Sequence, residues 1–140
     1  MINMLFQLET IVIAGIITTI VVSIIMFIIG IYVTRWYAKK KEWDDSLSAA
    51  FKVNLVWLIS GMFFSILFDL MFGENLLLDI LELVITIIIG ILIVKVVYKK
   101  EFGEAFVFAL VVQIILFLIA IVIGIIMGVT LGLVLVAILL

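Results

Sequence analysis

The segment IIGILIVKVVYKKEF, residues 88 to 102, is an apolar stretch that runs into a group of lysines. Sixty residues earlier the chain has a similar segment, IIGIYVTRWYAKKKEW, residues 28 to 43. At this offset Gly30 matches Gly90, and the basic residues that follow them fall opposite one another. Isoleucine matches arise easily by chance, so the interpretation depends on the glycine and the cations. The repetition predicts that one helical hairpin occurs twice, in residues 10–72 and 76–140.

The composition of the chain is that of a membrane protein. Of its 140 residues, 69% are hydrophobic and 13% are charged. The apolar residues fall into four blocks, and a helix needs about 20 such residues to cross ~30 Å of hydrocarbon. We therefore expect one all-α integral membrane domain over residues 1–140, whose two hairpins are related by an approximate two-fold axis along the membrane normal. The predicted spans are residues 10–34, 53–72, 76–97 and 111–133.

One apolar stretch of the chain is too long for a single crossing. Residues 105–140 would form about 54 Å of helix at 1.5 Å per residue, so we place the start of the fourth span at residue 111. The equivalent stretch before the second span contains Lys52, whose charge is too costly to lie deep in lipid. We expect that stretch to be an interfacial helix, with Asp44 or Asp45 as its N-cap.

All eight cations lie in or next to the two junctions at the inner ends of the predicted spans, and they predict an orientation. The positive-inside rule places short basic junctions in the cytoplasm. Both termini and the loop around Glu74 are then expected outside a cell or cytoplasmic membrane. The cations would anchor the inner helix ends against anionic lipid, and acidic neighbours such as Glu42 weaken the alternative of a docking patch, so no nucleic acid is expected as a partner. The cations are Arg35, Lys39, Lys40, Lys41 and Lys52 in the first junction and Lys95, Lys99 and Lys100 in the second.

The segment GIIMGVTLG carries three glycines at steps of four residues, Gly124, Gly128 and Gly132. Such a face lets two helix backbones approach closely in lipid, where there is little hydrophobic force for association. One interpretation is packing inside the chain, against Gly61 and Ser65 of the second span. The other is self-association or pairing with another membrane subunit.

Acidic residues occupy the side of the predicted domain that has no basic side chain. Asp79 and Glu82 are three residues apart, and Asp69 lies one turn before the end of the second span. Charge is costly inside the membrane, so these groups should face protein, water or a cation. They predict either a solvated outer rim or an entry site for protons or metal cations, without identifying the metal.

The remaining polar residues and the lack of catalytic motifs indicate a structural role and not an enzyme. At an offset of 59, Asn54 matches Gln113, and we expect these amides to pair between helices near the inner surface. The chain has no cysteine or histidine, and no nucleophile, metal-ligand or phosphate-binding motif is present. We expect no enzyme activity and no cofactor. The preferred hypothesis is a non-catalytic accessory or scaffold subunit; the alternative is a small oligomeric channel or transporter for protons or metal cations.

Overall fold

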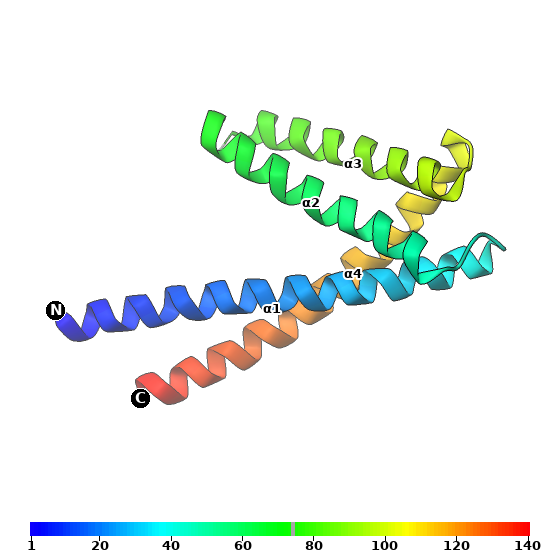
Figure 1. The fold of residues 1–140 in the computed structure, drawn as a ribbon. Coiled ribbons are helices and arrows are strands. Elements are labelled where there is room, and N and C mark those ends of the chain that lie inside the picture. Colours follow the sequence, from blue (N-terminus) through cyan, green and yellow to red (C-terminus); the bar gives the residue numbers. More distant parts are fainter. Residues whose placement is uncertain (74) are drawn as a thin grey trace.

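The computed structural model describes residues 1–73 and 75–140, and Glu74 lies outside the described residues. The described chain is entirely helical apart from its junctions (Figure 1). Each of its four helices is long and apolar enough to cross a membrane, which confirms the predicted all-α fold with four candidate spans. The helices are α1 (Ile2–Lys40), α2 (Leu47–Phe72), α3 (Leu76–Tyr98) and α4 (Phe102–Leu139).

The helix ends follow from local chemistry. Ser46 caps α2, and its hydroxyl accepts a hydrogen bond from the Ala49 N–H at 3.2 Å. The predicted cap at Asp44 or Asp45 is therefore wrong: the Asp44 carboxylate instead accepts from the Ser46 N–H at 2.9 Å and supports the capping residue from outside the helix. Gly73 ends α2 with a φ of +66°, a conformation that costs glycine little because it has no Cβ.

The helices are longer than the predicted spans. At 1.5 Å per residue the 39 residues of α1 and the 38 residues of α4 extend for about 58 and 57 Å. The stretch expected at the interface before residue 53 is the first part of α2 and is continuous with its span. Helices of such length exceed the hydrocarbon thickness, so they must tilt or project beyond it.

The four helices are arranged as two pairs. Figure 1 shows α2 beside α3 and α1 beside α4, with the pairs meeting where the basic junctions lie and separating toward the two termini. We call the meeting end the basic end; it holds the α1–α2 junction (41–46) and the α3–α4 junction (99–101). Around the bundle the backbone of each helix lies beside those of two neighbours, and within the described residues the backbones of α1 and α3, and those of α2 and α4, do not approach each other closely.

The buried core lies at the basic end. Its centre is Phe108, which is fully buried and stacks on Trp43 with ring centroids 4.7 Å apart. Tyr37 and Tyr98 complete the aromatic cluster, with centroids 5.1 and 5.2 Å from Phe108. Small residues let the helices approach closely around these rings. They are Ala38, Ala49, Ala105 and Ala109.

Candidate functional site

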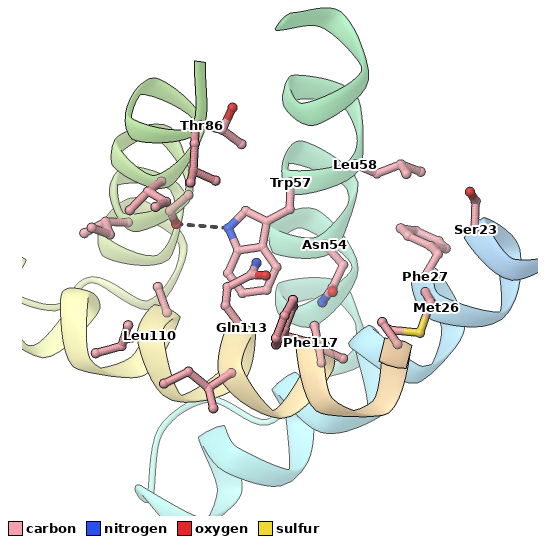
Figure 2. Close-up of a pocket in the computed structure, with 18 of the residues that line it drawn as sticks. Ser23, Met26, Phe27, Asn54, Trp57, Leu58, Thr86, Leu110, Gln113 and Phe117 are labelled. Carbon is pink, nitrogen blue, oxygen red and sulfur yellow. Dashed lines mark hydrogen bonds between the residues drawn. The ribbon is translucent and has the colours of Figure 1, made fainter. Parts of the chain in front are cut away.

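A cavity of about 660 Å³ lies between the two helix pairs, next to the core, and all four helices line it. Ile91 and Leu116 belong both to its wall and to the core. Figure 2 shows side chains from the four helices around one common space. Most of these side chains are apolar. Those labelled there are Ser23, Met26, Phe27, Asn54, Trp57, Leu58, Thr86, Leu110, Gln113 and Phe117.

Two glycines leave space for side chains of α2 that line the cavity. A methyl group on Gly90 would come within 2.9 Å of the Trp57 indole nitrogen, and one on Gly30 would overlap the Asn54 side-chain oxygen. The Trp57 N–H donates a hydrogen bond to the Gly90 carbonyl at 3.1 Å (Figure 2). In both copies of the repeated segment, a side chain of α2 therefore occupies the space that a Cβ on the glycine would need.

Asn54 links α1 and α2 through a buried polar chain. Its amide donates to the Thr34 hydroxyl and to the Ala50 carbonyl, both at 2.9 Å. Thr34 in turn donates to the Gly30 carbonyl at 2.6 Å. The expected Asn54–Gln113 pair is wrong because Thr34, on the adjacent helix, already satisfies the Asn54 donor.

Gln113 is the exception among the polar side chains of the wall. The Ser23 and Thr86 hydroxyls donate to their own helix backbones, at Thr19 and Glu82. Gln113 is exposed to the cavity, and no described residue forms a hydrogen bond with its amide. The wall thus presents one unpaired amide within an apolar surface.

The glycine face of α4 does not pack against any described part of the chain. A methyl group on Gly124, Gly128 or Gly132 would meet no described atom within 4 Å, and the same holds for Gly61. Ser65 is exposed. The interpretation that Gly61 and Ser65 receive this face is therefore wrong for this structure, because the two helix pairs separate before these positions are reached.

The acidic residues are not gathered into a metal site. Asp69 and Asp79 are exposed and Glu82 is half-buried. Within residues 1–73 and 75–140, no three acidic side chains form a group that could hold a metal ion. The helix ends around residue 73 are neighbours in the chain, but that proximity does not aim their side chains at one point. Cation or proton entry at these residues remains a prediction.

The basic residues gather on aromatic rings at the basic end. Lys40 lies 5.1 Å from the Trp36 ring centroid, and Lys100 lies 5.2 Å from that of Trp43. The second of these pairs joins the two junctions, so the cations that the sequence placed on one side do lie at one end of the molecule. Arg35 donates from Nε to the Asp45 carbonyl at 2.9 Å. Lys39 and Lys95 lie in the last turns of α1 and α3, where a cation complements the helix dipole. Lys41 lies 5.7 Å from the centroid of the Tyr37 ring. Lys99 is the C-cap of α3.

The sequence interpretation missed Trp57. Its position in the sequence could have identified it. Tryptophan in membrane helices is enriched at the interfaces, whereas Trp57 lies ten residues into α2, within the predicted second span. A tryptophan at that depth needs a partner for its N–H. In the structure the partner is the Gly90 carbonyl.

Comparison with known proteins gave no relative: no protein-family model, no curated protein and no solved structure matches this chain.

Proposed function

We propose that this chain is a non-catalytic membrane protein, an accessory or scaffold subunit that associates with another transmembrane helix through its small-residue faces. The observation that carries the proposal is the contrast between two sets of glycines. A Cβ on Gly30 or Gly90 would meet a neighbouring side chain, whereas a Cβ on Gly124, Gly128 or Gly132 would meet no described atom within 4 Å. Three glycines on one face of an apolar helix allow another helix backbone to approach closely, and none of residues 1–73 and 75–140 makes that approach here.

Small residues continue the glycine face along α4 and form a similar face on α2. Residues four apart lie on nearly the same face of a helix. Gly124 and Gly128 follow Ala120 at such steps on α4, and Ala120 lines the cavity. Gly61 and Ser65 likewise continue the face of α2 that bears Trp57 and Leu58. A partner helix entering between the pairs would therefore meet small residues on two sides, and it would be a second copy of this chain or a helix of another subunit.

We also propose that the two hairpins are copies of one unit. The burial of equivalent positions supports this. At an offset of 60, Gly30, Ile31, Thr34 and Ala38 are buried, as are Gly90, Ile91, Val94 and Tyr98. At an offset of 59, Ala49, Ala50 and Val53 are buried, as are Phe108, Ala109 and Val112. A duplicated hairpin accounts for the repeated pattern because each copy packs on the other through the same face.

The proposed orientation has the basic end in the cytoplasm and both termini outside, because every lysine and arginine lies in the junctions of that end or close beside them. Single cysteines at positions 40, 74 and 100 of this cysteine-free chain can be labelled from either side of the membrane. We expect a membrane-impermeant thiol reagent to reach positions 40 and 100 from one side and position 74 from the other. Labelling of positions 40 and 74 from the same side would overturn this orientation.

The association proposal is tested by replacing Gly124 and Gly128 together with leucine. Two bulky side chains would hold a partner helix away, so the complex should be lost. The melting temperature of the isolated chain should not fall, because no described atom lies within 4 Å of either added Cβ. The matched control is Ile125→Leu with Val129→Leu, at exposed positions on another face of α4. A drop in melting temperature without loss of association would show that the glycines pack internally.

A further inference from the structure

The cavity lies at the depth of the membrane hydrocarbon. Trp57 lies four residues beyond the expected start of the second span at residue 53, and Gln113 lies two residues beyond the expected start of the fourth span at residue 111. The lining of α4 continues to Ala120, so at 1.5 Å per residue the cavity reaches about 14 Å into that span. The hydrocarbon layer is ~30 Å thick. The surroundings of the cavity are therefore lipid chains, and molecules dissolved in lipid have access to it.

The unpaired Gln113 amide selects among such molecules. An amide without a hydrogen-bond partner is costly in an apolar environment. The other polar groups of the wall use their donors within the protein: Asn54 on Thr34, Trp57 on Gly90, and the hydroxyls of Ser23 and Thr86 on their own helices. A guest that offers a hydrogen-bonding group to Gln113 would remove this cost.

The wall also restricts the charge and shape of a guest. No charged side chain lines the cavity, and an ion at this depth would have no counter-charge. On α4 the lining runs from Phe106 to Ala120, so Gln113 lies at the middle of it with apolar wall on both sides. A fitting guest is uncharged and has its polar group partway along an apolar body. The volume, about 660 Å³, is within the ~300–1,000 Å³ typical of small-molecule sites.

We infer that the cavity binds one uncharged lipophilic molecule, whose mid-chain carbonyl or hydroxyl group hydrogen-bonds with the side chain of Gln113. The site adjoins the small-residue faces, because Ala120 belongs to its wall and Gly124 follows it on the same face of α4, but binding of the guest does not require the association proposed above. Bulk acyl chains and water are the competing occupants. Neither would show a preference that depends on a polar group in the guest.

Photolabelling tests the inference. The protein in phosphatidylcholine nanodiscs is labelled with a long-chain ketone, its carbonyl at mid-chain and a diazirine near one end, and the modified residues are mapped by mass spectrometry. We expect saturable labelling of the cavity wall, for example at Met26, Leu110 or Phe117. The ketone without diazirine should compete about tenfold better than the alkane of equal length at the same membrane concentration, as one net hydrogen bond implies.

Three variants separate the outcomes. Gln113→Leu should abolish the preference for ketone over alkane and leave the labelling itself. Ala120→Phe should narrow the cavity and weaken saturable labelling, whereas Leu118→Ala, at an exposed position outside the cavity, should change neither the labelling nor the ketone preference. Circular dichroism melts establish that each variant is folded. Non-saturable labelling, or equal competition by ketone and alkane in the native chain, would overturn the inference, as would a ketone preference that survives in Gln113→Leu.

Discussion

Replacing Gly90 with leucine should destabilise the fold strongly. A Cβ at this position already comes within 2.9 Å of the Trp57 indole nitrogen, and leucine adds three further carbons beyond it. The indole would have to move, and its hydrogen bond to the Gly90 carbonyl would break. Overpacking costs roughly 1–3 kcal/mol, and the half-buried indole N–H left without a partner adds up to about 1–3 kcal/mol. We expect a clear fall in melting temperature in detergent.

Gly15→Leu is the matched control for this prediction. A Cβ at Gly15 meets no described atom within 4 Å. Leucine also has a better helix propensity than glycine by up to ~1 kcal/mol. The melting temperature of Gly15→Leu should therefore stay the same or rise slightly. If both variants melted alike, the close approach of α2 to Gly90 would not contribute to stability.

Phe108→Ala should have a comparably large effect, because it removes the centre of the aromatic cluster. Phe108 is fully buried and contacts rings from α1, α3 and the α1–α2 junction. Truncation of a buried phenylalanine costs about 3–5 kcal/mol in soluble proteins, through lost contacts and the cavity left behind. Since the cluster joins the two helix pairs at the basic end, we expect unfolding at a much lower temperature or denaturant concentration.

Two controls isolate the cause of the Phe108 effect. Phe117→Ala makes the same truncation at a side chain that is 65% exposed, and it should cost little. Tyr98→Phe keeps the ring and removes a buried hydroxyl that has no hydrogen-bond partner among the described residues. That change should leave stability unchanged or raise it. A loss in Tyr98→Phe as large as in Phe108→Ala would mean that the hydroxyl, and not ring packing, supports the core.

The membrane spans could be predicted from the sequence because their length and composition leave few alternatives. Residues 53–72 and 76–97 lie inside the observed α2 and α3, and the cations of both junctions do lie at one end. The helix faces were harder to predict. In lipid, the residues that face a neighbouring helix are as apolar as those that face the bilayer, so the pattern around Leu116 or Ile91 does not show which side is buried.

Polar residues in the spans were equally ambiguous until their neighbours were known. Asn54 and Gln113 match in sequence, yet Thr34 satisfies one and no described residue satisfies the other. The difference is a single hydroxyl group, because position 34 is threonine and its counterpart at position 94 is valine, which has a methyl group in place of the hydroxyl. The glycines of α4 illustrate the same limit: their spacing predicts a contact, but the separation of the helix pairs decides whether the chain can make that contact itself.

The central claim is that the exposed glycine face of α4 binds another transmembrane helix. Its most direct test is the mass of the complex extracted from its own membrane into native nanodiscs, with the lipids retained. We expect the native chain, 15.7 kDa, to leave the membrane in a complex of more than one polypeptide, whose mass distinguishes a second copy from a different subunit. The Gly124→Leu, Gly128→Leu variant should be extracted as a single chain, while Ile125→Leu, Val129→Leu keeps the complex. A native chain that is extracted alone, or a complex that survives the two leucines unchanged, would contradict the claim.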